Sequence, residues 1–315
     1  MITQPHILFF GTPEFASPSL SALVENGYKI VGIVTMPDEP AGRNQTLTPP
    51  PIKILAESLG LPIFQPKKLE KEMWLNSMPE ADIFVLVAYG KILPSWLLEL
   101  PRFGTINIHP SLLPKFRGPS PIQNALLAGE KTTGVSIMLM DKDIDHGPIL
   151  ALQQIPIDNT DTIISLSEKL AYIGAKILCQ TIPEWTSHSL KPIAQDHSKA
   201  TFTKIIKKED GHINWSREAK QIINQLRAFA IWPKCWTILE NNSQKTRIII
   251  LNAHTTTRQS HTVTPGTSII NTNEFLIATN DYFIAIDKLQ PENKKEMSAS
   301  AFLQGYKLDS LTRFT

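Results

Sequence analysis

The stretch DIFVLVA, from Asp82 to Ala88, is an almost wholly apolar run of strand length. Such a run is typical of a parallel β-strand, because helices cover both of its faces. Similar short runs stand before and after it, and helical patterns separate them. This alternation predicts a doubly wound, Rossmann-like α/β domain with a mostly parallel sheet. Further strands are expected over residues 6–10, 30–35, 104–108 and 135–140, and helices over 14–26, 52–58, 122–128 and 163–185.

The second half of the chain has a different pattern. Residues 187–203 are polar and broken by Pro192, and one helical pattern follows over 216–229. Short strands separated by turn residues then indicate a small, OB-like β-barrel. We therefore expect a first domain over residues 1–188, a linker over 189–205 and a barrel domain over 206–315. The strands of the barrel are expected over 236–240, 247–253, 274–278 and 283–289.

The two halves also differ in charge. Residues 1–186 carry 14 Lys and Arg against 18 Asp and Glu, whereas residues 187–315 carry 17 against 11. A basic half is typical of proteins that bind a polyanion. Drift in composition between two domains explains the counts equally well.

Composition excludes several classes of protein. No apolar run approaches the roughly 20 residues of a membrane-spanning helix, and the N-terminus does not resemble a signal peptide, so a cytoplasmic location is expected. Cys179 and Cys235 fall outside any metal-ligand spacing and are expected to be free thiols. After the first strand the glycine-rich dinucleotide fingerprint is missing, which argues against NAD and FAD.

Two polar residues stand at the end of the strand expected over 104–108. Asn107 and His109 are two residues apart and so share one face of an extended strand, and Pro110 ends that strand. Ligands of doubly wound folds bind outside the carboxyl ends of the strands. An amide beside an imidazole at that edge can stabilise an oxyanion, although a histidine by itself is more often a structural hydrogen-bonding residue.

An acidic segment, from Asp141 to Pro148, directly follows the strand expected to end at Met140. Three acids at alternate positions suggest a calcium loop, but Gln153 stands where such a loop needs a glutamate. The segment is then either a solvated turn or the source of a carboxylate that pairs with His109 and orients its ring.

The order of these segments resembles that of the formyltetrahydrofolate-dependent formyltransferases. The resemblance covers about residues 7–303 and is closest to the branch of the family that acts on methionyl-tRNA. The matching segments are Asn107-x-His109-x-Ser111-Leu112-Leu113-Pro114, Arg117-Gly118, Asp145-x-Gly147-Pro148, Phe10-Gly11-Thr12-Pro13, Tyr89-Gly90 and Trp232-Pro233.

The resemblance implies transfer of the formyl group of 10-formyltetrahydrofolate to the amine of methionyl initiator tRNA, for translation initiation, with no metal and no NAD. It implies a catalytic trio of Asn107, His109 and Asp145. We also expect a monomer. The residues that the resemblance places at the folate co-substrate are Ser111, Leu112, Leu113, Pro114, Tyr89 and Gly90.

The resemblance also indicates where tRNA binds. In the family a loop at residues 36–50 reaches the acceptor stem, which makes Arg43 a recognition residue, although the loop by itself reads equally as a plain surface loop. Lys207, Lys208 and Arg247 are the expected phosphate contacts of the basic half. Trp232 and Trp236 are expected to take part in core and interdomain packing rather than to stack on bases.

Three alternatives remain open at this point. The chain can be a formyltransferase for an amino sugar nucleotide, or a hydrolase that releases formate from the same folate. It can also be a non-catalytic tRNA-binding protein on the same scaffold, although such a protein has no need of the catalytic trio. His146, which follows Asp145, is expected to bring a second imidazole close to the site.

Overall fold

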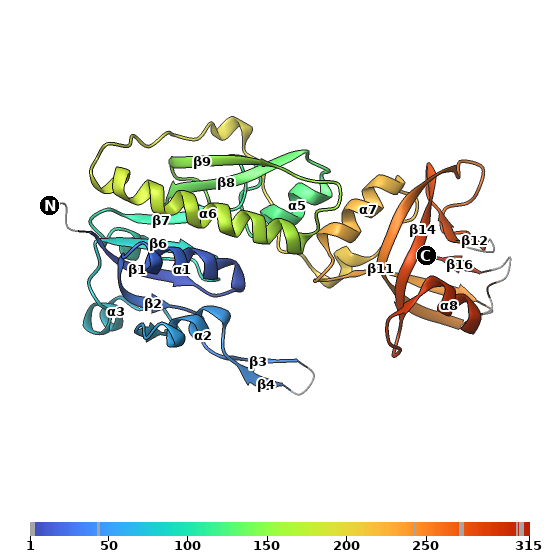
Figure 1. The fold of residues 1–315 in the computed structure, drawn as a ribbon, viewed down its shortest axis with the longest axis horizontal. Helices are drawn as coiled ribbons and strands as arrows, with labels where there is room; N and C mark the ends of the chain where they lie inside the picture. Colours follow the sequence, from blue (N-terminus) through green and yellow to red (C-terminus); the bar gives the residue numbers. More distant parts are fainter. Residues whose placement is uncertain (1–3, 43–44, 242–243, 271–273, 307, 309–311) are drawn as a thin grey trace. The chain divides into compact units, whose positions relative to one another are not determined.

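The computed structural model describes residues 4–42, 45–241, 244–270, 274–306, 308 and 312–315. It contains two compact units (Figure 1). The first unit comprises the chain up to Pro121 together with Thr132–Pro156 and Ser167–Thr203, and the second comprises Ile122–Lys131, Ile157–Leu166 and the chain from Lys204 onward. Among the described residues, no helix combines the length and apolar character needed to cross a membrane.

The first unit is built on a seven-stranded sheet in the order β5-β2-β1-β6-β7-β8-β9. The first five strands of this order are parallel, and β8 and β9 are antiparallel to their neighbours. The predicted α/β class is therefore confirmed. The strands are β1 (His6–Gly11), β2 (Lys29–Val34), β5 (Ile63–Phe64), β6 (Ile83–Val87), β7 (Thr105–His109), β8 (Thr132–Leu139) and β9 (Ile149–Pro156).

Four helices lie at the expected positions, namely Ser17–Glu25, Pro51–Ser58, Pro121–Leu127 and Ile163–Thr186, whereas the helices Lys71–Ser77 and Ser95–Leu98 and the short strand β5 were not predicted. All five residues of β6 are buried, as expected for the central apolar run. Sequence reasoning missed β9 and the short hairpin of β3 (Glu39–Ala41) and β4 (Thr46–Thr48). Strand β9 begins with the apolar residues 149–152, but four of its eight residues are exposed, so it lacks the buried pattern of the central strands. The helices are α1 (Ser17–Glu25), α2 (Pro51–Ser58), α3 (Lys71–Ser77), α4 (Ser95–Leu98), α5 (Pro121–Leu127) and α6 (Ile163–Thr186).

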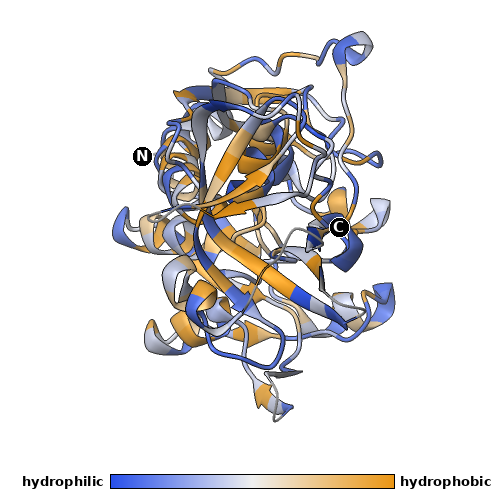
Figure 2. Cartoon of the chain, turned by 90° about the vertical axis from the view of Figure 1, so that its right-hand side faces the viewer, coloured by the Kyte–Doolittle hydropathy of each residue, from blue (hydrophilic) through white to orange (hydrophobic). Residues whose placement is uncertain are grey.

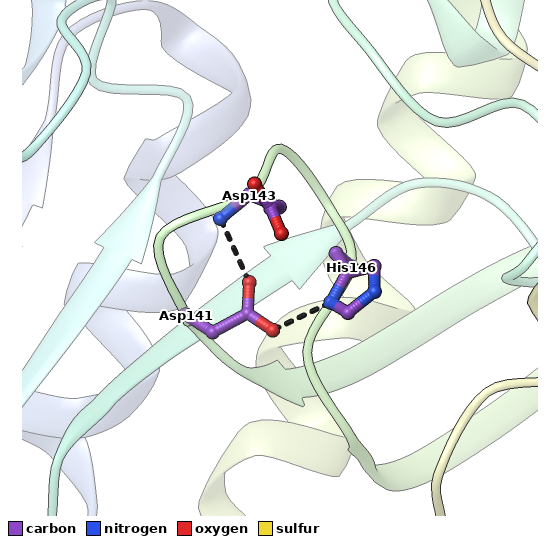
Figure 3. A group of neighbouring side chains, drawn as sticks. All are labelled: Asp141, Asp143 and His146. Carbon is purple, nitrogen blue, oxygen red and sulfur yellow. Dashed lines mark hydrogen bonds and ion pairs between the residues drawn. The ribbon is translucent and has the colours of Figure 1, made fainter.

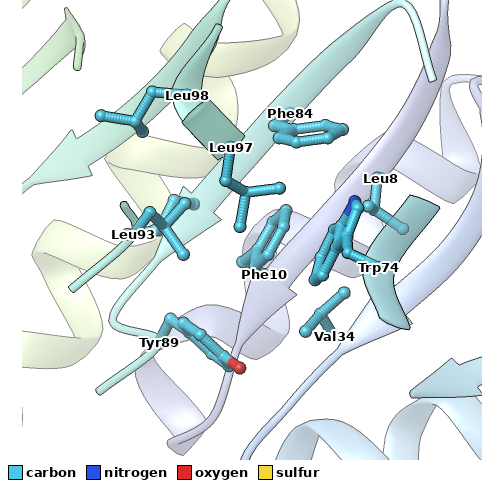
Figure 4. Close-up of a cluster of buried hydrophobic side chains, with 10 residues drawn as sticks. Leu8, Phe10, Val34, Trp74, Phe84, Tyr89, Leu93, Leu97 and Leu98 are labelled. Carbon is cyan, nitrogen blue, oxygen red and sulfur yellow. The ribbon is translucent and has the colours of Figure 1, made fainter. Parts of the chain in front are cut away.

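One face of this sheet packs around the ring of Phe10 (Figure 4). Phe10 stacks on Trp74 of α3, with ring centroids 5.8 Å apart and planes 6° apart. Tyr89 meets the same ring edge-on at 5.5 Å. Each aromatic pair of this kind stabilises a fold by about 0.5–1.5 kcal/mol beyond its buried area. The carboxyl ends of β1 and β6, where Phe10 and Tyr89 lie, are thus fixed by aromatic packing.

Helix α6 packs closely against β7. At Gly174 a Cβ atom would lie 2.9 Å from the side chain of Ile108, so only glycine allows this approach without a shift. Strand β7 also lies between β6 and β8 in the sheet. Its last residue, His109, therefore stands on a strand that is held on several sides.

The second unit contains an antiparallel sheet in the order β12-β13-β14-β11-β10-β16, with β15 added beside β14. A bridge between Thr267 and Arg313 joins the two ends of this order, so the sheet forms a nearly closed barrel, as predicted. Hydrophobic residues are frequent along the strands (Figure 2). The elements are α7 (Ala219–Ala228), β10 (Cys235–Asn241), β11 (Gln244–Gln259), β12 (Ser268–Ile270), β13 (Phe275–Ala278), β14 (Tyr282–Pro291), β15 (Met297–Ser298), α8 (Ala299–Gly305) and β16 (Arg313–Phe314).

The polar stretch expected as a linker pairs with the first unit. Ile193 forms a bridge with Ile149, and Phe202 forms one with Arg117. Between these two bridges Gln195 is buried. The predicted domain boundaries remain a prediction, but the stretch up to Thr203 belongs to the contacts of the first unit.

Candidate functional site

His109, the last residue of β7, is buried in the first unit with both ring nitrogens facing oxygen atoms. Its Nε2 lies 3.0 Å from the carbonyl oxygen of Phe116. A carbonyl oxygen only accepts hydrogen bonds, so Nε2 carries a proton in this arrangement. The other nitrogen, Nδ1, lies 3.5 Å from a carboxylate oxygen of Asp145. The imidazole is thus held between a carbonyl group and a carboxylate, as the sequence predicted for the carboxylate.

The backbone of two loops positions the Asp145 carboxylate. Its Oδ2 accepts a hydrogen bond from the backbone N–H of Gly118 at 2.7 Å. Both residues adopt left-handed backbone angles, with φ of +50° at Asp145 and +105° at Gly118. Left-handed φ is costly for most side chains, whereas glycine adopts it freely. The loop after β8 and the loop after β7 therefore meet at this hydrogen bond.

Asn107 lies two residues before His109 on β7, so both side chains leave the same face of the strand. Its backbone pairs with Leu86 of β6 and Met138 of β8. Asn107 is 6% exposed, and its side chain makes no hydrogen bond within the part of the chain that the structure describes. An amide on the same strand face as an imidazole can donate to a substrate oxygen.

The segment Ser111–Pro114, predicted to contact folate, follows His109 directly and is tied to β8. The hydroxyl of Ser136 donates to the carbonyl of Ser111 at 2.7 Å and accepts from the backbone N–H of Leu113 at 3.1 Å. The hydroxyl of Ser111 donates to the carbonyl of Lys115 at 2.6 Å. The backbone of the segment Ser111–Pro114 is therefore fixed next to the predicted catalytic residues. Leu112 is half-buried and Leu113 buried, and the Leu113–Pro114 peptide bond is cis.

Tyr89 and Gly90 were also predicted to contact folate. The Tyr89 side chain lies in the core, where burial raises the pKa of its hydroxyl to about 12. The phenol therefore stays neutral and is unsuited to act as a base near neutral pH. Gly90 is exposed, with φ of +98°. If this segment contacts the carrier, it does so through backbone atoms, and its role stays a prediction.

His146 does not join the pair formed by His109 and Asp145. Its Nδ1 lies 2.6 Å from Oδ2 of Asp141, whose Oδ1 accepts from the backbone N–H of Asp143 (Figure 3). The ring of His146 stacks on His197, with centroids 4.0 Å apart and planes 3° apart. The ligand atoms of Asp141, Asp143 and His146 lie within 4.8 Å of one another, a spacing that suits a metal ion. Their hydrogen bonds to one another equally satisfy a solvated turn.

Three of the residues predicted to contact tRNA lie close together in the second unit. Lys207 and Lys208 are adjacent and exposed. The indole N–H of Trp236 donates to the carbonyl of Lys208 at 3.2 Å, and the guanidinium of Arg247 lies 4.4 Å above the Trp236 ring. Arg43 lies outside the described residues. Trp236 is half-buried, and Trp232 is 57% exposed and so lies outside the core, while its expected interdomain packing stays a prediction.

Both cysteines are free thiols, as expected. Burial raises the pKa of the Cys235 thiol, and burial followed by the charge of Glu25 raises that of Cys179. Neither thiol is activated as a nucleophile.

Sequence reasoning missed two residues that lie beside the site, Gln195 and His197. Gln195 is buried, and His197 lies against His146 and Arg117. No periodicity or charge run marks either residue, because both stand in a polar stretch whose regular structure is limited to one turn of 3-10 helix, His197–Lys199. Only their contacts with the two loops distinguish them.

Comparison with known families gives matches over both units. Residues 5–182 match the family described as "Formyl transferase", and residues 205–307 match "Formyl transferase, C-terminal domain". A methionyl-tRNA formyltransferase from Bacillus velezensis is 41% identical over 301 residues, which is 95% of this chain and 94% of the relative. The corresponding enzyme of a Geobacillus species is 42% identical over the same shares.

Solved structures share the fold at lower identity. An N-formyltransferase from Helicobacter canadensis, in complex with folinic acid and dTDP-3-aminofucose, has a TM-score of 0.66 at 18% identity over 89% of this chain and 98% of its own. HypX from Aquifex aeolicus, in complex with tetrahydrofolic acid, has a TM-score of 0.62 at 14% identity over 96% of this chain and 47% of its own.

Proposed function

Because the chain belongs to the formyl transferase family, we propose that it transfers the formyl group of 10-formyltetrahydrofolate to the amine of methionyl initiator tRNA, for translation initiation. The observation that carries this proposal is identity of about 41% with methionyl-tRNA formyltransferases along 95% of the chain. That identity spans the second unit as well as the first. The family is folate-dependent, and HypX was solved with tetrahydrofolic acid, which supports a folate carrier.

The geometry of the first unit suits acyl transfer to an amine. The amine attacks the formyl carbon on N10 of the carrier, and a tetrahedral oxyanion forms. The Asn107 amide, which has no other hydrogen bond in the described structure, and the His109 imidazole stand together at the strand edge to stabilise that charge. The formyl oxygen would take the place of the Phe116 carbonyl or lie beside it.

Proton transfer completes the reaction. The attacking amine loses a proton as the new C–N bond forms, and the departing N10 gains one. Asp145, with one oxygen toward His109 and the other held by Gly118, is placed to orient the imidazole and to pass that proton directly or through water. The role of the Asp145 carboxylate is thus distinct from that of the exposed Asp141.

The second unit is proposed to hold the tRNA. Lys207, Lys208 and Arg247 gather near Trp236, and this half of the chain carries the excess of basic residues. Arg43 is proposed to read the acceptor stem. The chain is proposed to act as a monomer in the cytoplasm, without a metal or NAD.

A formyltransferase for a sugar nucleotide is the nearest competitor. The Helicobacter canadensis enzyme shares the fold at 18% identity, well below the 41% shared with the methionyl-tRNA enzymes. The decisive assay incubates the chain with formyl-folate and, separately, methionyl initiator tRNA, an amino sugar nucleotide or water alone. Formylation of the tRNA supports the proposal. Transfer only to the sugar, or release of formate without an acceptor, overturns it.

Salt dependence of binding tests the proposed tRNA surface. A phosphate that is neutralised by a Lys or Arg releases its counterions. Each duplex phosphate contact therefore makes the slope of log affinity against log salt concentration more negative by about 0.9. Replacing Lys207, Lys208 or Arg247 with alanine in the full chain should weaken tRNA binding and flatten that slope. Lys288→Ala is the matched control, because Lys288 is on the same barrel but already pairs with Glu296 at 2.8 Å. Equal effects from the control would place the tRNA elsewhere.

A further inference from the structure

Gln195 connects the two loops that carry the proposed site. Its side-chain N–H groups donate to the carbonyl of Asp145 at 3.0 Å and to that of Gly147 at 2.7 Å. Its side-chain oxygen accepts from Nη2 of Arg117 at 2.6 Å and from Nε of the same residue at 3.2 Å. One buried amide therefore uses both its donors and its acceptor to join two loops. We call them the Arg117 loop, which follows β7, and the Asp145 loop, which follows β8.

Arg117 is buried in the first unit, with only 3% of its surface exposed. Its Nη2 also donates to Nδ1 of His197 at 2.9 Å. Arginine only donates, so Nδ1 of His197 carries no proton in this arrangement. Within the described residues no carboxylate pairs with Arg117. The groups that accept hydrogen bonds from its guanidinium, Gln195 and His197, are neutral. A buried cation without an ion-pair partner is costly, which argues for a role other than stability.

The segment that supplies Gln195 is itself anchored at both ends. Ile193 exchanges backbone hydrogen bonds with Ile149 just after the Asp145 loop. At the other end, the Thr203 hydroxyl donates to the carbonyl of Arg117 at 3.0 Å and accepts from the backbone N–H of Ser120. The stretch 193–203 therefore straps the Arg117 loop to the Asp145 loop.

We propose that Gln195, held by Arg117, is a positioning residue that sets the Asp145 carboxylate against His109. Gln195 fixes the backbone of Asp145, and Arg117 precedes Gly118, whose N–H holds the same carboxylate at 2.7 Å. Two supports thus converge on Asp145, from its own backbone and from its side chain. Neither Gln195 nor Arg117 contacts the His109 ring by a hydrogen bond in the described structure. This inference rests on the proposed formyl transfer.

The test uses the full chain with Gln195→Met and Gln195→Glu. Methionine keeps the length but loses every hydrogen bond. Glutamate keeps the acceptor for Arg117 and replaces the donors to Asp145 and Gly147. Misplacement of a reacting group by about 1 Å costs roughly 10²-fold in rate, so kcat should fall about 10- to 100-fold in both variants. KM for formyl-folate and for tRNA should stay near the wild-type values. Gln154→Met, an exposed glutamine on β9, is the matched control.

Two further readouts separate positioning from folding. Thermal unfolding and circular dichroism report whether each variant is folded, and NMR of the His109 ring nitrogens reports the environment of the imidazole. Shifted His109 signals together with a reduced kcat in a folded variant support the proposal. If Gln195→Met does not fold, Gln195→Glu is the variant on which the proposal is tested. Wild-type kcat in either folded variant, or a loss that matches only the unfolded fraction, overturns it. A wild-type chain that does not formylate methionyl-tRNA would instead refute the proposed function.

Discussion

Two histidine–aspartate pairs involve the loop between β8 and β9, and they differ in every property except residue type. The Asp141–His146 pair has the shorter distance, 2.6 Å, but each side chain is 35% exposed. The His109–Asp145 pair is longer, 3.5 Å, and its side chains are only 5% and 14% exposed. Water competes with the first pair, whereas protein groups surround the second. The comparison shows that burial and further hydrogen bonds, rather than a short distance, distinguish the pair suited to chemistry.

The further contacts explain this difference. The carbonyl of Phe116 and the N–H of Gly118 fix the two partners of the buried pair from outside it. The exposed pair is completed by its own loop, through the N–H of Asp143, and by a stacked imidazole. The hydrogen bonds of the buried pair thus reach the loop after β7, whereas those of the Asp141–His146 pair stay within one loop.

The largest effect is expected from His109→Ala. Loss of a positioned catalytic group typically costs about 10²- to 10⁴-fold in rate, and tRNA affinity should stay near wild type. His146→Ala is the matched control and should change the rate by less than about threefold, because its imidazole is exposed and pairs with a solvated carboxylate. Steady-state formylation and tRNA binding measure both variants. Near-normal turnover of His109→Ala would remove the catalytic role from the buried pair.

A somewhat smaller effect is expected from Asp145→Asn. The amide oxygen can still accept from the Gly118 N–H, so the loop should stay folded, but the charge that faces His109 is lost. We expect a loss of about 10²-fold in kcat, with little change in thermal stability. Comparison of kcat and of the unfolding temperature with wild type checks both parts. If the unfolding temperature falls and kcat does not, Asp145 is a structural residue.

Gly118→Ala should have an intermediate effect on both activity and stability. At φ of +105° an added Cβ would lie 2.8 Å from the carbonyl oxygen of Thr203, so strain of about 1–3 kcal/mol is expected. The N–H that holds Asp145 should move, and kcat should fall about 10-fold. Gly27→Ala is the control, because Gly27 also has positive φ but has no neighbour within 4 Å. It should lose stability without losing kcat, and equal losses of kcat in the two variants would contradict this reading.

The smallest effect is expected from Asp141→Asn. An ion pair that is partly open to solvent, as this one is with each side chain 35% exposed, stabilises a protein by less than about 1 kcal/mol. We expect the rate to stay within about twofold of wild type, and addition of a chelator to leave it unchanged. Formylation rates with and without chelator check both points. A large loss in either experiment would show that the exposed cluster, including Asp143, binds a metal that the reaction needs.

The sequence predicted the sheet more completely than the site. The buried strands β1, β2, β6 and β7 stand where their apolar runs indicated, because a parallel strand covered on both faces must be apolar throughout. Strand β9, at the edge of the sheet, was missed although it begins with the apolar residues 149–152. Alternation along β7 put Asn107 and His109 on one face of the strand. Strand β8 runs antiparallel to β7, with Leu139 opposite Ile106, so only the path of the loop after β8 brings Asp145 to His109.

What the sequence determined by itself follows from local chemistry: apolar periodicity set the elements, and the motifs around His109 and Asp145 indicated the family. Which of the three acids of the loop meets His109 was left open by the residues alone. The fold decided it through a left-handed backbone at Asp145 and the N–H of Gly118. Gln195 is the clearest case of what only the tertiary structure decides. In the sequence, a polar residue in a polar stretch looks like part of a solvent-exposed linker. In the structure Gln195 is buried and joins two loops, because its hydrogen-bond partners lie about 50 and 78 residues away in the chain.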